Sequence, residues 1–135
     1  MNARSIGIAL ATVTLCLLPL AAGEESAHEK ALKQIISSLD KLTMTLAGIK
    51  DAETAQAARP ELRKAVMGWA EARKKADKLP PPEPAEKDRL AKQYKGKMDE
   101  AVKKFFTEVG RVRGFPAGKE ALDEVRPVID AKPPP

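Results

Sequence analysis

The chain has 135 residues, enough for one domain, and its 24 basic and 19 acidic side chains give a formal charge of +5. This modest basic excess lacks the dense positive charge of a dedicated nucleic-acid binder, so we expect no specific nucleic acid as a partner. Alanine, lysine, leucine and glutamate are abundant, and aromatic residues make up only 4%. Together with the apolar periodicity described below, this composition is typical of an all-α protein.

The first 23 residues have the pattern of a secretory signal peptide. Arg4 supplies a positive charge, residues 6–20 form a nearly unbroken apolar run, and residues 21–23 are small, as a cleavage site requires. An uncleaved membrane anchor is the alternative, but the run is short for a membrane span. We therefore predict an exported protein, periplasmic or secreted, whose mature helical domain occupies residues 24–131.

The single cysteine, Cys16, lies within this apolar run. The residue before it, Leu15, is not the small residue that a lipoprotein cleavage site needs, and apolar sequence continues beyond it. Cys16 is therefore predicted to leave with the signal peptide. The mature chain would then contain no cysteine, which excludes disulfides, thiolate metal sites and thiol nucleophiles.

The first predicted helix follows Ser26, which together with Glu29 has the spacing of an N-terminal capping box. Behind it, apolar residues recur at alternating steps of three and four residues and form one stripe. They are Leu32, Ile35, Leu39, Leu42, Leu46 and Ile49. Ile36 widens the stripe, as expected for a helix that faces more than one neighbour. Gly48 and Asp51 end this helix, and Asp51 can cap the next one.

Pro60 divides the next stretch. Residues 52–58 are alanine-rich and predict a short helical turn, whereas Pro60 followed by Glu61 has the signature of a fresh helix start. A continuous helix kinked at Pro60 is the alternative. The second long helix directs a further apolar set inward: Leu62, Val66, Trp69, Ala72, Ala76 and Leu79. For Trp69, the largest of them, a place in the core is favoured over a role as a ligand platform.

A proline-rich bend lies near the centre of the chain. The three consecutive prolines at residues 80–82 cannot lie inside a helix, because each lacks the N–H donor and crowds the preceding turn. We expect this bend to join the second and third helices as an antiparallel hairpin. The third helix is predicted to run from Pro84 to about Arg113.

A shorter segment follows over residues 116–130, where Pro127 kinks or splits the helix, and residues 132–135 form a disordered proline tail. The predicted fold is an all-α, up-down-up antiparallel helical bundle of three main helices with a shorter C-terminal helix.

The sequence contains no catalytic signature. His28 is the only histidine, so neither a Ser/His/Asp set nor a Cys/His pair can be assembled in the mature chain. No two carboxylates share an apolar face at helical spacing. The glycines between residues 110 and 118 follow a helix and surround a proline, which is the wrong context for a phosphate-binding loop. We therefore expect no enzymatic activity, no metal and no cofactor.

One stretch resembles a family of haem-binding bundles. Residues 39–65, in which residues 49–52 precede an alanine-rich run, are similar to the first helix, loop and second-helix start of soluble cytochrome b562. That family ligates haem through a methionine of its first helix and a histidine of its last. Here Met44 lies off the apolar stripe, and the final helix has no histidine. The resemblance implies the bundle topology without haem.

A second resemblance is to small, uncharacterised exported helical-bundle proteins of bacteria. It rests on the signal peptide, the Pro60-Glu61-Leu62 helix start, the proline-rich bend and the run from Tyr94 to Gly96 in the third helix. This likeness implies an exported helical protein and brings no activity with it.

We predict a small exported non-enzymatic protein with a binding or structural role in the cell envelope or outside the cell. The candidate binding surface is the basic side of the third helix: Lys92, Lys95, Lys103, Lys104, Arg111 and Arg113. Such a surface would attract an envelope protein, anionic envelope polymers or lipid head groups through salt-sensitive contacts. The alternative is a solvated helix face, in which acids pair with lysines four residues on, as Glu100 does with Lys104.

Two further hypotheses come from other classes of protein. A cofactor or metal carrier of cytochrome b562-like architecture would use scattered soft ligands: His28, Met44, Met67 and Met98. A self-associating subunit would instead bury apolar residues beside the main stripes, such as Ile36 and Phe106, against a second copy.

Overall fold

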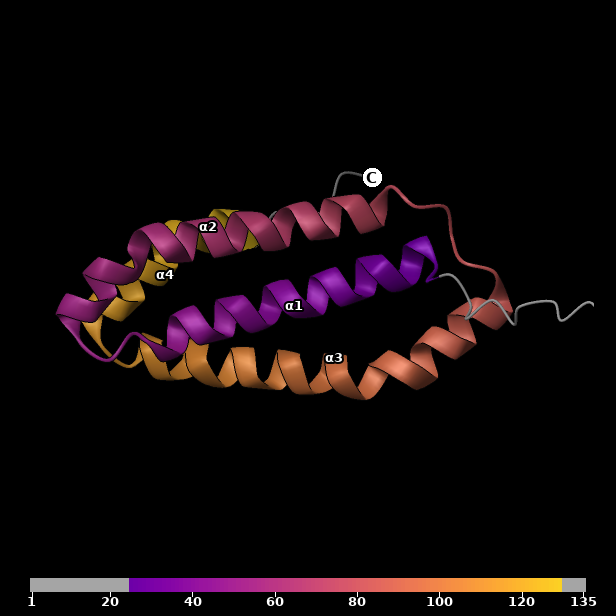
Figure 1. The fold of residues 1–135 in the computed structure, drawn as a ribbon. Helices are drawn as coiled ribbons and strands as arrows, with labels where there is room; N and C mark the ends of the chain where they lie inside the picture. The colour runs from indigo at the N-terminus through magenta and orange to yellow at the C-terminus, as the bar shows by residue number, and fades with distance from the viewer. Residues whose placement is uncertain (1–24, 130–135) are drawn as a thin grey trace, which may run out of the picture.

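The computed structural model describes residues 25–129, so the predicted signal peptide (1–23) and proline tail (132–135) lie outside the described residues. Four helices follow one another: α1 (Ala27–Ala47), α2 (Ala52–Asp77), α3 (Pro84–Arg113) and α4 (Pro116–Ile129) (Figure 1). The prediction of an all-α bundle with three long helices and a shorter C-terminal helix is confirmed. Helix α3 begins and ends where the sequence predicts.

Each helix runs antiparallel to the one before it, and α1 lies between α2 and α3 (Figure 1). Helix α1 packs against α2 and α3, and α4 packs against the same two helices. Within residues 25–129, the backbones of α2 and α3 do not come close to each other, and neither do those of α1 and α4. The helices therefore occupy four corners in the order α1, α2, α4, α3, and the neighbouring pair α1 and α3 runs parallel.

The proline bend carries the chain from α2 to α3 across one end of the bundle (Figure 1). The antiparallel directions predicted for these two helices are confirmed. Their packing as a hairpin is wrong, because α1 separates them. The His28 ring, in the first turn of α1, lies against the bend, with Nε2 2.6 Å from the Pro80 carbonyl oxygen. The bend therefore passes beside the N-terminal end of α1.

The core lies where the four helices meet. Its most deeply buried large side chains are aliphatic: Leu42, Leu46, Ile49, Leu62, Val66 and Val112. Burial of each such side chain contributes about 1.5–3 kcal/mol, so this set is the main source of stability. The stripe predicted for the first helix is buried from Leu39 onward, whereas Leu32 and Ile35 are only half-buried. Trp69 packs against the core, with the Arg73 guanidinium 4.8 Å from its ring centre.

Helices α1 and α2 begin with different caps. Ser26 Oγ accepts a hydrogen bond from the Glu29 N–H at 3.1 Å, as the sequence predicts. The predicted return bond from Glu29 is replaced by contacts of its carboxylate with α3, so that half of the capping box is wrong. At α2 the box is complete: Asp51 Oδ1 accepts from the Thr54 N–H at 2.8 Å, and Thr54 Oγ1 accepts from the Asp51 N–H at 2.9 Å.

Helix α2 continues through Pro60, so the predicted fresh start is wrong and the alternative of a continuous helix is confirmed. The N–H that proline lacks would have bonded the carbonyl of Gln56, an exposed residue, so no buried acceptor is stranded. Ala55 and Leu62, on either side of the proline, are both buried in the same core. This shared burial favours one helix over two. Helix α4 likewise continues through Pro127.

Gly118, in the first turn of α4, lies close to the end of α3. A Cβ at this position would lie 2.8 Å from both Val112 Cγ1 and Phe115 Cζ, and closer still to the Val112 carbonyl oxygen. We predict that Gly118→Ala destabilises the bundle by about 1–3 kcal/mol, because overpacking forces these atoms apart. Gly96→Ala is the control, since nothing lies within 4 Å of the added methyl group there. Equal urea midpoints for the two variants would contradict the prediction.

Candidate functional site

Helix α4 is too short to cover the whole bundle. It has 14 residues, against 21, 26 and 30 in α1, α2 and α3. At 1.5 Å per residue it spans about 21 Å, roughly half the length of α3. Because α4 follows directly on the C-terminus of α3 and runs back antiparallel to it, it can reach only the C-terminal half of that helix. Figure 1 shows α4 beside the N-terminal part of α2. The N-terminal half of α3 therefore lacks this neighbour.

The uncovered part of the bundle contains an apolar groove of about 370 Å³, which we call the open-end groove. Its main apolar lining residues are Leu32 and Ile35 of α1, Leu79 after α2, and Leu90, Ala91 and Met98 of α3. Leu32 and Ile35 belong to the apolar stripe predicted for the first helix, and the groove explains why they are only half-buried. The groove is therefore a part of the core face that no fourth helix covers.

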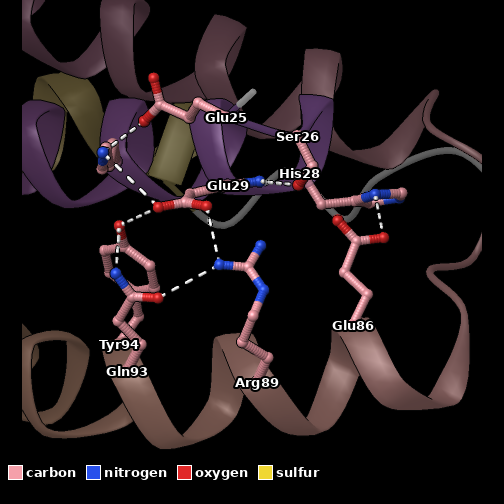
Figure 2. A network of polar contacts seen from close by, with 9 residues as sticks. Glu25, Ser26, His28, Glu29, Glu86, Arg89, Gln93 and Tyr94 are labelled. Carbon is pink, nitrogen blue, oxygen red and sulfur yellow. Dashed lines mark hydrogen bonds and ion pairs between the residues drawn. The ribbon is translucent and has the colours of Figure 1, made fainter. Parts of the chain in front are cut away.

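A polar network joins α1 to α3 beside this groove (Figure 2). The Tyr94 hydroxyl donates to Glu29 Oε1 at 2.7 Å, and Arg89 Nη1 donates to Glu29 Oε2 at 3.0 Å. Glu29 is only 8% exposed and Tyr94 only 4%. Lys33, one turn further along α1, has its Nζ 3.6 Å from Glu29 Oε1. The buried carboxylate is thus fully engaged, and it aligns the N-terminal ends of α1 and α3.

These contacts shift the pKa values of the residues involved. The hydrogen bond from Tyr94, and after it the one from Arg89, holds the pKa of Glu29 below its ordinary value of 4.5. The same bond raises the pKa of Tyr94, because the phenol donates to a carboxylate. The pKa of Lys33 is raised mainly by its contact with the Glu25 carboxylate. At neutral pH these shifts favour an ionised Glu29, a neutral Tyr94 and a charged Lys33, which are the forms that make these contacts.

His28 is half-buried in the first turn of α1. Its Nδ1 lies 3.4 Å from Glu86 Oε2 (Figure 2), and its Nε2 contacts the Pro80 carbonyl oxygen. The ring therefore links α1, the proline bend and α3, and it also lines the open-end groove. Within residues 25–129, no group of three His, Cys, Asp or Glu side chains is placed to hold a metal ion.

Two of the six basic residues predicted as a binding surface are engaged within the protein. Arg111 Nη1 and Nη2 donate to the carbonyl oxygens of Ile49 and Leu46, each at 2.7 Å. These bonds tie α3 to the backbone at and just beyond the C-terminal end of α1, where Leu46 O also accepts from the Ile49 N–H at 3.0 Å. Lys104 Nζ lies 2.6 Å from Glu100 Oε1, which confirms the pair predicted four residues apart.

The other four basic residues are exposed and spread along α3: Lys92, Lys95, Lys103 and Arg113. From residue 92 to residue 113 the helix rises about 32 Å. Only Lys95 among the six lines the open-end groove. The structure thus separates these residues into different environments, and a binding role for the basic side as a whole stays a prediction.

The residues of the two rival hypotheses are also dispersed. Two of the four soft ligands line the open-end groove: His28 and Met98. The other two are exposed, Met44 at 74% and Met67 at 59%. The exposure of Met44 agrees with its predicted position off the apolar stripe. Of the residues suggested for self-association, Ile36 packs against the core, whereas Phe106 is 64% exposed.

The open-end groove and the Glu29 network are not predicted from the sequence. A signal for the network is present, because Glu29 stands three residues before Leu32 and Tyr94 stands four residues after Leu90. Each polar residue therefore shares a face with its apolar stripe. A signal for the groove is the short fourth helix, which cannot cover three longer ones.

No protein-family model matches the chain, and comparison with curated proteins and with solved structures finds no match. Over the described ranges of the chain, no helix combines the length and apolar character needed to cross a membrane. In its described part, residues 25–129, the protein is all-helical and has four helices.

Arg111 provides a test of the α1–α3 alignment. We predict that Arg111→Ala lowers the free energy of unfolding by about 1–2 kcal/mol, because two backbone carbonyls lose a charged donor. Arg113→Ala is the matched control, an exposed arginine on the same helix, and should change stability by less than about 0.5 kcal/mol. Urea unfolding followed by circular dichroism measures both variants. Equal losses would show that Arg111 has no special role.

Glu29 makes the free energy of unfolding depend on pH, and the pKa of its carboxyl group gives the direction of the change. Because its pKa is lower in the folded protein than the ordinary 4.5, its contribution is fully present above pH 4.5 and is lost as the pH falls through the folded value. We predict that Glu29→Gln lowers the urea midpoint at pH 7 and that the difference from the unaltered protein shrinks below pH 4.5. Glu71→Gln, at an exposed position on α2, is the control. A difference that persists unchanged into acid would contradict the assignment.

Proposed function

We propose that the protein is a non-enzymatic binding protein, exported to the cell envelope or beyond, that holds a small apolar ligand in the open-end groove. The observation that carries this proposal is the uncovered core face, where Leu32, Ile35 and Met98 line a groove of about 370 Å³. Covering apolar surface is favourable by about 25 cal/mol per Å², so an apolar molecule gains by binding there.

The size of the groove fits a small molecule. Small-molecule sites commonly have volumes of about 300–1,000 Å³, and the groove falls in the lower part of that range.

The lining of the groove supports binding without catalysis. The Tyr94 hydroxyl is engaged by Glu29, and the two nitrogens of His28 contact Glu86 and the Pro80 carbonyl. Among the described residues, no serine, threonine, cysteine or carboxylate side chain lines the groove. A ligand therefore meets an apolar surface on which Tyr94 and His28 already have partners, and no nucleophile stands beside a base.

The expected compartment is consistent with this function. The predicted signal peptide and the likeness to small exported helical-bundle proteins of bacteria both support export. In an aqueous compartment an apolar molecule benefits from a protein that removes its surface from water. A bundle with one uncovered end would supply such a surface.

Binding of N-phenylnaphthylamine, a neutral dye whose fluorescence rises in apolar surroundings, tests the proposal. We predict that the purified protein binds the dye and that Ala91→Phe, which fills the groove, weakens binding at least about tenfold. Ala85→Phe is the matched control, because Ala85 is an exposed residue of α3 that does not line the groove. Circular dichroism checks that both variants keep their helices. No dye binding by the unaltered protein, or equal binding by the two variants, would overturn the proposal.

A further inference from the structure

Two lysines stand at the open-end groove. Among residues 25–129, Lys87 and Lys95 are the only lysine or arginine side chains that line it, and no carboxylate lines it. They stand eight residues apart on α3, with Ala91 midway between them. At that spacing all three share one side of the helix, and the two lysines are about 12 Å apart along its axis.

Several cations at the helix contacts have acidic partners. Arg89 bonds Glu29, and Arg59 pairs with Glu120 and Glu124 of α4. Lys104 and Arg111 pair with acids of their own helix. Lys87 and Lys95 make no such contact within the described residues, although they lie at the edge of an apolar surface. An anionic group bound at this edge would give them the kind of partner that these cations have.

We propose that the open-end groove takes a single-chain amphiphile with one anionic head group. The apolar chain lies along Leu32, Leu90 and Met98, and the head group lies at the edge beside Lys87 or Lys95. This inference rests on the proposed function, and it adds the charge and shape of the ligand. One chain fits better than two, because the groove volume of about 370 Å³ lies near the lower limit for ligand sites.

The lysines give selectivity more than affinity. Both side chains are solvent-exposed, so each contact with a head group is screened by water and salt. Because one head group pairs with one lysine at a time, we expect the loss of both to weaken binding of an anionic amphiphile by up to about fivefold, the upper end of values for exposed ion pairs. Binding of a neutral ligand of the same chain length should change less, since such a ligand makes no ion pair with either lysine.

Displacement of N-phenylnaphthylamine by two ligands of equal chain length tests the inference. Dodecanoate, used below its micelle concentration, is predicted to displace the dye at lower concentration than dodecanol. The double variant Lys87→Gln/Lys95→Gln should remove this preference, with displacement expressed relative to the dye affinity measured for each variant. Lys92→Gln/Lys103→Gln is the matched control, because it removes the same charge from the same helix away from the groove. Added salt should reduce the preference in the unaltered protein.

The outcomes separate this inference from the proposed function. If dye binds but dodecanoate and dodecanol displace it equally, the anionic head group is wrong and the apolar groove stands. If both double variants lose the preference equally, general charge on α3 is responsible and the placement at the groove is wrong. If free dodecanoate does not displace the dye, while vesicles with anionic lipids bind the protein, its target is a membrane surface and the inference is overturned.

Discussion

Helix α1 packs against both α2 and α3, whose backbones stay apart from each other within the described chain. The rest of the structure depends on this central position of α1. A helix with two such neighbours needs a wide apolar face, and the stripe from Leu39 to Ile49, widened by Ile36, provides it. Polar contacts then fix the two ends of the parallel α1–α3 pair. Arg111 bonds the C-terminal carbonyls of α1, and Glu29 bonds α3 at the other end. The alignment of the pair is thus set at both ends.

The same arrangement decides where the bundle is open. In the order α1, α2, α4, α3, helix α4 lies opposite α1 and fills the remaining space between α2 and α3. It has only 14 residues, so it leaves part of that space uncovered. At this end, Tyr94 bonded to Glu29 and His28 against Pro80 hold the helices where apolar burial is incomplete. An end held by polar contacts keeps its shape without a ligand, and a preformed site loses less entropy on binding.

Local chemistry was predictable from the sequence, and long-range relations were not. The bend at residues 80–82 and the Asp51 cap follow from effects that act within a few residues. A stripe shows which face of a helix is buried, but it does not show which helix covers that face. Pro60 suggests a helix break for this reason. The free-energy cost of a proline in a helix is local, whereas the apolar residues buried on both sides of Pro60 stabilise the helix over its whole length. At Glu29, a return bond to the cap competes with charged and phenolic donors on α3, and the stronger charge-assisted bonds prevail.

The charges in the sequence likewise do not show which basic residues have a function. Their positive charge places six basic residues of α3 in one group. What each of them can bind depends on the groups that lie beside it in the folded protein. Arg111 faces the carbonyls of α1, Lys104 faces Glu100, and Lys95 faces an apolar groove with no acid in its lining. Lys87 lies beside the same groove, and sequence alone does not separate it from the other lysines. Selectivity for an amphiphile therefore depends on where a cation stands relative to uncovered core, because the chain of the ligand and its head group must be bound together.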